Sequence, residues 1–80
     1  MKVLRKVVDF IEDKEIKLTV NPNQLYIANY LEIVRFDDHH IVIKYNTGTI
    51  NITGQDLMIS KLLTDEILIT GSILKIEIEG

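Results

Sequence analysis

A pattern of eight residues decides the fold, and it occurs as ITGQDLMI at residues 52–59 and as ITGSILKI at residues 69–76. In both copies apolar residues occupy the first, sixth and eighth positions, and a glycine occupies the third. The same template fits residues 20–27 and 36–43, where another turn-forming residue replaces the glycine. The four copies begin 16, 16 and 17 residues apart. The sequence therefore predicts a repeat of four units.

Each unit has a further apolar residue two positions before the template, so the units align in four apolar columns. The columns are Leu18, Val34, Ile50 and Ile67; Val20, Phe36, Ile52 and Ile69; Leu25, Ile41, Leu57 and Leu74; and Ile27, Ile43, Ile59 and Ile76. The turn position contains Pro22, Asp38, Gly54 and Gly71. Ile, Val and Thr make up 26 of the 80 residues, and such β-branched residues favour strands. The fold is therefore predicted to be mainly β.

Two architectures satisfy this pattern, because a period of two fits both parallel and antiparallel strands. In a β-solenoid each unit is one coil, and the near-constant spacing favours this interpretation. In an antiparallel meander or small barrel of about eight strands each unit is a hairpin, as the turn-like residues 45–49 around Gly48 suggest. We expect the solenoid, with the meander as the alternative. A plain run of short amphipathic strands would also give regular apolar spacing.

The N-terminal residues follow a helical period instead. At 100° per residue, six apolar residues of the segment 2–13 share one arc and six charged residues share the opposite arc. The apolar set is Val3, Leu4, Val7, Val8, Phe10 and Ile11. We predict an amphipathic helix over residues 1–14 that caps the β-repeat region, residues 16–79. A helix that binds a membrane or a partner is the alternative, although its polar face carries no net charge.

Composition narrows the classes of protein. The 80 residues are expected to form a single domain, and with no cysteine they contain no disulfide, thiol nucleophile or Cys-based zinc site. Nine basic against 12 acidic residues give a net charge of −3, which argues against general nucleic-acid binding. No apolar run approaches the roughly 20 residues of a membrane-spanning helix, and we expect no secretory signal.

Residues with catalytic or metal-binding chemistry are sparse. The residue types that bind metal ions cluster at Asp37, Asp38, His39 and His40. Because neighbouring residues of a strand point to opposite faces, we expect this cluster to be a polar turn and not a metal site. We expect the acidic pair in residues 64–66 to lie in a loop, where solvent surrounds both carboxylates. We therefore predict no catalytic residue, no cofactor and no metal site. The alternative function is a ligand or nucleic acid bound on a sheet face, which would require Arg35, Lys44, Lys61 and Lys75 to converge.

Residues 43–78 resemble the YabP/YqfC family of sporulation proteins. The shared elements are Gly48, the I-x-I-x-G-x-x-L-x-I run of residues 50–59, the leucine-rich step with an acidic pair at residues 62–66, and the I-x-I-x-G-x-I run of residues 67–73. Residues 25–36 look like the YqfC branch. One departure is that acidic residues interleave with basic residues near the N-terminus.

The resemblance implies a non-enzymatic protein of the mother-cell cytoplasm in sporulating bacteria. It would take part in spore envelope or coat formation, with a membrane-protein partner or membrane association through such a partner as one option. The last strand has nothing in the sequence to cover its edge, and an open edge is a site of self-association. We therefore expect a homo-oligomer or filament formed through Ile73, Leu74, Ile76 and Ile78, without nucleic acid.

Overall fold

A computed structural model of the chain describes residues 15–80, so the predicted helix over residues 1–14 lies outside the described part. The strands are β1 (Lys17–Asn21), β2 (Gln24–Ala28), β3 (Glu32–Phe36), β4 (His40–Tyr45), β5 (Gly48–Leu62) and β6 (Glu66–Glu79). They form one sheet in the order β1-β2-β6-β5-β4-β3, with antiparallel neighbours throughout. The mainly-β prediction is confirmed for these residues.

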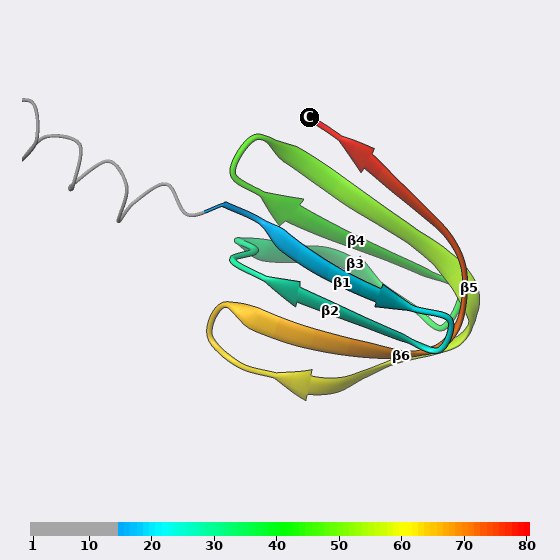
Figure 1. Cartoon of the computed structure of the whole chain (residues 1–80). Coiled ribbons are helices and arrows are strands. Elements are labelled where there is room, and N and C mark those ends of the chain that lie inside the picture. The colour runs from blue at the N-terminus through cyan, green and yellow to red at the C-terminus, as the bar shows by residue number, and fades with distance from the viewer. Residues whose placement is uncertain (1–14) are drawn as a thin grey trace, which may run out of the picture.

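Strands β5 and β6 are long and bend together, which folds the sheet into two layers (Figure 1). The first layer contains β1, β2, residues 66–70 of β6 and residues 58–62 of β5. The second layer contains β3, β4, residues 48–55 of β5 and residues 72–79 of β6. We call the two straight parts of each long strand its first and second arm, in chain order.

The bends in β5 and β6 require unusual backbone conformations. Gly71 has a φ of +126°, and a Cβ atom placed there would lie 2.5 Å from the carbonyl oxygen of Asp56. Asp56 itself adopts a φ of +55°. At Gly54 a Cβ atom would lie 2.1 Å from the Ser72 oxygen. Two backbones thus cross closely at the corner, which only glycine permits at these two positions.

The core lies between the two layers. Eight Leu and Ile side chains, all members of the repeat columns, are almost fully buried: Leu25, Ile27, Ile41, Ile43, Ile50, Ile52, Ile67 and Ile69. Tyr45 and Leu57 complete the buried hydrophobic set of residues 15–80. Each fully buried side chain of this kind stabilises the fold by about 1.5–3 kcal/mol. The central strands β2 and β4, with the first arms of β5 and β6, supply most of the core.

The expectation of a parallel solenoid is wrong for the described residues, because every ladder is antiparallel. The alternative meander is closer to the structure. The first two units are the hairpins β1–β2 and β3–β4, with Pro22 and Asp38 in their turns. The last two units are the bent strands β5 and β6, with Gly54 and Gly71 at the corner. Two arms per unit give eight straight segments in only six strands.

The near-constant spacing has a different cause, which is an approximate two-fold symmetry between the layers. β2 pairs with β6 through Leu25↔Ile69 and Ile27↔Ile67. β4 pairs with β5 in the equivalent way, through residues 41↔52 and 43↔50. The hairpin turns also dock alike: the Gly71 amide donates to the Asn23 oxygen (3.2 Å) and the Gly54 amide to the His39 oxygen (3.0 Å). Because the strands related by this axis have equal lengths, the repeat units that contain them also have nearly equal lengths.

Candidate interaction site

The folded sheet leaves four edge segments, and they differ in regularity. β3 is interrupted by a register shift between Ile33 and Arg35, and the second arm of β5 by one between Ile59 and Lys61. Such bulges disturb the row of free amides and carbonyls and protect an edge from pairing. β1 is regular over five residues. In the second arm of β6 the register steps past Leu74, and residues 75–79 beyond it form the other regular edge among residues 15–80.

The second arm of β6 runs along the first arm of β5 on one side only. Its residues 75–79 pair in unbroken register with residues 53–49 of β5. On its other side, within the described part of the chain, the arm joins no ladder, and its backbone is bonded only at the corner, where the Ile73 amide donates to the Pro22 oxygen (3.3 Å). Beyond that point this arm presents an unpaired strand edge, which is the usual template for adding another strand.

The four residues proposed for self-association all lie on this arm, but they are not equivalent. Ile73 and Ile76 are partly buried and touch the core. Leu74 is 65% exposed and Ile78 56% exposed. Leu74 has no cross-strand partner, because the register steps from Lys75 to Ile73 at this point. The arm therefore combines a free edge with apolar side chains that the monomer covers only in part.

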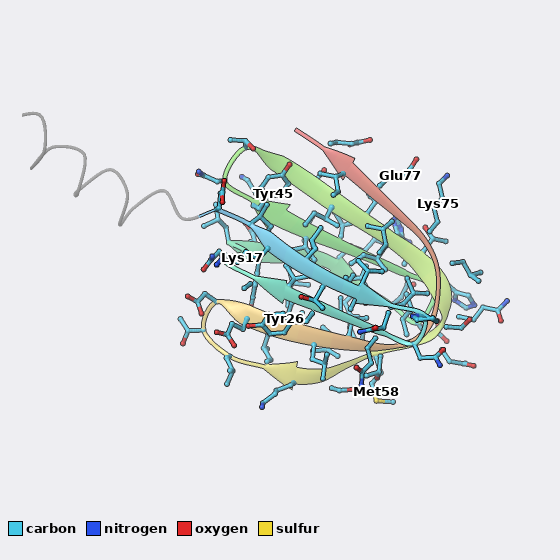
Figure 2. All side chains as sticks on the ribbon, viewed as in Figure 1. Lys17, Tyr26, Tyr45, Met58, Lys75 and Glu77 are labelled. Atoms are coloured by element: carbon cyan, nitrogen blue, oxygen red, sulfur yellow. The ribbon has the colours of Figure 1, made fainter. Side chains whose placement is uncertain are left out.

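Charged side chains occupy the opposite face of the arm. Figure 2 shows Lys75 and Glu77 directed away from the interior. The Lys75 ammonium lies 3.4 Å from the Glu77 carboxylate, and both side chains are largely exposed. An exposed pair of this kind contributes little to the stability of the monomer. Its alternation of sign gives the edge a charge pattern that a partner strand can match.

The histidine and aspartate cluster forms a turn, as the sequence analysis expects. One oxygen of Asp37 accepts hydrogen bonds from the amides of His39 (2.9 Å) and His40 (2.7 Å), and the other lies 3.2 Å from Arg35. The pKa of Asp37 is lowered, first by the His39 amide and further by the His40 amide and Arg35. Asp37, Asp38 and His39 offer ligand atoms within 4.8 Å of one another. Because Asp37 is engaged by backbone amides, the turn explains this arrangement without an ion.

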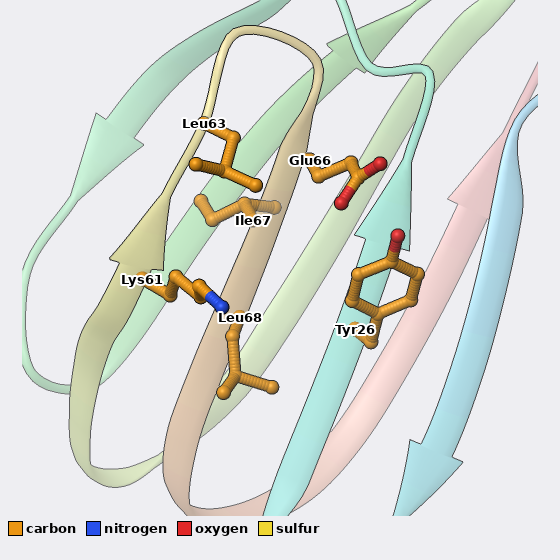
Figure 3. A pocket seen from close by; sticks show the side chains of 6 residues that line it. All are labelled: Tyr26, Lys61, Leu63, Glu66, Ile67 and Leu68. Carbon is orange, nitrogen blue, oxygen red and sulfur yellow. The ribbon is translucent and has the colours of Figure 1, made fainter.

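A small pocket lies on the first layer near the loop between β5 and β6 (Figure 3). Its volume is about 170 Å³, and Tyr26, Lys61, Glu66 and Leu68 line it. A hydrogen bond with Glu66 is the main cause of the raised pKa of Tyr26, followed by burial and by the charges of Glu66 and Asp65. Ligand sites usually measure about 300–1,000 Å³, so this pocket is small for one.

The four basic residues required by the alternative function do not gather. Lys61 lies on the first layer, whereas the other three lie on strands of the second. Arg35 is next to Asp37 (3.2 Å), and Lys75 is next to Glu77. Lys44 stands opposite Glu32 in the β3–β4 ladder. Acidic neighbours thus accompany the basic side chains of the second layer, and a basic stripe for phosphates does not form there.

Two features of the surface were not foreseen from the sequence. One is the Tyr26–Glu66 pair, whose residues are 40 positions apart and meet through the β2–β6 ladder. The other is a groove of about 350 Å³ between the β1–β2 turn and the second arm of β6, lined by residues that include Val20, Pro22 and Leu74. No pattern within one segment indicates either feature, because each depends on which strands become neighbours.

Comparison with known proteins identifies the family of the chain. The model of the YabP family matches residues 11–80. The chain belongs to the YabP family. Membership makes it a sporulation-related protein, from a family that is not known for enzymatic activity. Searches of curated proteins and of solved structures each found no significant match. Among residues 15–80, no helix has the length and apolar character needed to cross a membrane.

Proposed function

We propose that this YabP-family protein is a non-enzymatic assembly module of spore envelope or coat formation, and that it pairs with a second copy through the second arm of β6. The observation that carries the proposal is the regular free edge at residues 75–79, with Leu74 and Ile78 exposed beside it. The family supplies the process. A cytoplasmic location in the mother cell, and contact with a membrane-protein partner, belong to the same proposal.

The charge pattern selects a register for this pairing. Two copies of the arm related by a two-fold axis run antiparallel. The residue on the axis then faces the same residue of the second copy, and a residue before it faces the residue that lies equally far after it in the second copy. If the axis passes through Ile76, Lys75 faces Glu77 of the second copy twice, and Leu74 faces Ile78 twice. If it passes through Glu77, Lys75 faces Glu79 of the second copy twice, but the two Glu77 carboxylates face each other, which is destabilising, and Leu74 faces Gly80 instead of an apolar side chain. The register centred on Ile76 therefore satisfies both the charges and the apolar face.

Such pairing joins the second layers of two copies into one continuous sheet. The order becomes β3-β4-β5-β6 in one copy, followed by β6-β5-β4-β3 in the other. The edge of β1, regular and five residues long, stays available in each copy. A second pairing through that edge would extend dimers into a filament, because two different two-fold contacts on one chain need not close.

A charge-exchange experiment tests the register. We expect Lys75→Glu alone, and Glu77→Lys alone, to lose self-association, because like charges then face each other twice. The loss is on the order of 1–3 kcal/mol, or about ten- to a hundredfold in the association constant. A one-to-one mixture of the two variants should associate again, since the two acidic side chains of one variant then face the two basic side chains of the other. Sedimentation over a concentration series measures this.

The matched control is Lys44→Glu, which changes the net charge as Lys75→Glu does but lies on β4, an interior strand. It should associate like the wild type. A wild-type chain that stays monomeric at high concentration would refute edge pairing. A mixture of the two single variants that associates no better than each alone would refute the register.

A further inference from the structure

A groove between the two layers lies directly beside the proposed pairing edge. It has a volume of about 350 Å³ and runs between the β1–β2 turn and the second arm of β6. Val20 and Pro22 line it from the first layer, and Leu74 and Ile76 line it from the second. Val20 is 57% exposed and Leu74 65% exposed. The walls are therefore largely apolar, and the groove is open to solvent within the described part of the chain.

The exposed apolar side chains on this side of the molecule belong to the inner faces of the layers. Val20 faces the same side of its sheet as Leu25, which is buried. Ile78 faces the same side as Ile50, which is also buried, but is itself 56% exposed. It lies four residues beyond Leu74, or about 13 Å along an extended strand. The arm thus has the groove at its corner end and an exposed apolar side chain at its other end, on the same face.

We infer, on the basis of the pairing proposed above, that the groove of each chain receives the Ile78 side chain of a second copy. In the register centred on Ile76, Leu74 lies beside Ile78 of the second copy. The two-fold axis that relates two antiparallel strands is perpendicular to their sheet, so the inner faces of both copies point to the same side. Ile78 of the second copy therefore points toward the first layer of the first copy, where the β1–β2 turn forms the other wall of the groove.

The contact forms twice, because the axis exchanges the two copies. Three side chains that are each more than half exposed in one chain, Val20, Leu74 and Ile78, then become buried together. Burial of apolar surface is the main favourable contribution to most protein association. The first layer thereby takes part in an interface that edge pairing alone would confine to the second layer.

The β1–β2 turn also limits the length of the ladder between the copies. The Ile73 amide already donates to the Pro22 oxygen (3.3 Å), so it is not available to a second strand. In the register centred on Ile76, residue 73 would face residue 79 of the second copy. The ladder therefore ends beside the groove, and Ile78 is the last apolar residue that the second strand brings to it.

The opposite side of the molecule exposes apolar side chains to a similar extent but lacks a regular edge within residues 15–80. Between β3 and the second arm of β5, Val34 is 54% and Leu62 56% exposed. Both of these strands contain a register shift, which prevents a second strand from running along them in regular register. Val34 is thus a matched control for Val20, because both are valines on edge strands with nearly the same exposure.

An acidic side chain in the groove tests its role. In the full chain, Val20→Asp should lower the association constant at least about tenfold, because two carboxylates would enter apolar grooves in each dimer. Val34→Asp makes the same change on the other side and should associate like the wild type. Sedimentation over a concentration series measures both variants. An unchanged association constant for Val20→Asp, or an equal loss for the two variants, would overturn the inference.

A double-mutant cycle identifies the occupant of the groove. Val20→Ala and Ile78→Ala should each lower the association constant, by about tenfold for Val20→Ala, since two contacts are lost in each dimer. The double variant should associate about as weakly as Ile78→Ala alone, because Val20 then has no side chain to contact. Single effects that simply multiply in the double variant would show that another part of the second copy, or another molecule, occupies the groove, and would overturn the inference.

The cycle separates this contact from edge pairing itself. Val20 and Ile78 are too far apart along one chain to interact directly, so coupling between them reports on a contact between copies. If the mixture of Lys75→Glu and Glu77→Lys associates while the cycle shows no coupling, the register stands and the groove contact is wrong. If the wild-type chain stays monomeric at high concentration, both the pairing and the groove contact are wrong.

Discussion

At the scale of single residues, the corner decides how the sheet folds. Position 71 requires glycine for two reasons. Its φ is +126°, and the carbonyl oxygen of Asp56 lies 2.5 Å from the place that a Cβ atom would occupy. The bend it allows is what brings the layers together over Ile67 and Ile69. The glycine pattern in the sequence located this position correctly, but it predicted a turn between strands instead of a bend within one strand.

The change Gly71→Ala should therefore destabilise the protein strongly. The added methyl group must move the backbone of residues 56–57, and L-residues rarely adopt this φ, so we expect a loss on the order of 2–4 kcal/mol in the free energy of unfolding. Denaturant unfolding followed by circular dichroism measures it. Ser72→Ala, at an exposed neighbouring position, is the control and should change stability by less than about 0.5 kcal/mol. Similar small effects for both variants would show that the corner tolerates side chains.

At the scale of strands, the sequence predicted which residues alternate but not which strands pair. A period of two is common to parallel and antiparallel ladders, so the regular spacing supported a solenoid that the structure does not have. The self-association residues were placed on the last strand from its alternation and its open edge, and they do lie on an edge arm. The contrast with the bulged edges of β3 and β5 could not be foreseen, because a bulge appears only when two strands are compared.

Members of one apolar column therefore differ in their contribution to stability. Val34 and Ile50 share a column, yet Val34 sits in the bulge of β3 and is 54% exposed, whereas Ile50 is fully buried. We expect Ile50→Ala to cost about 2–5 kcal/mol, because it opens a cavity between the layers. Val34→Ala should cost less than about 0.5 kcal/mol. Thermal and denaturant unfolding compare the two variants, and equal losses would mean that Val34 is covered in solution.

At the scale of the whole molecule, the two layers share their longest strands. β5 and β6 each pass through both layers, so neither layer has a complete set of strands without the other. The hairpins β1–β2 and β3–β4 are attached at symmetric places and pack on opposite sides of one core. Repeat proteins built from stacked units can unfold at one end first. This chain has repeated units in its sequence but a single folded sheet in space.

The shared strands predict one cooperative transition. Ile27 in the first layer and Ile43 in the second are equivalent under the two-fold relation, and both are fully buried. We expect Ile27→Ala and Ile43→Ala each to cost about 2–5 kcal/mol. Either change should reduce hydrogen-exchange protection in β2 and β4 by the same factor, because global unfolding then controls the exchange of both layers. If Ile43→Ala left β2 protected as in the wild type, the layers would be separate folding units, and the long strands would not couple them.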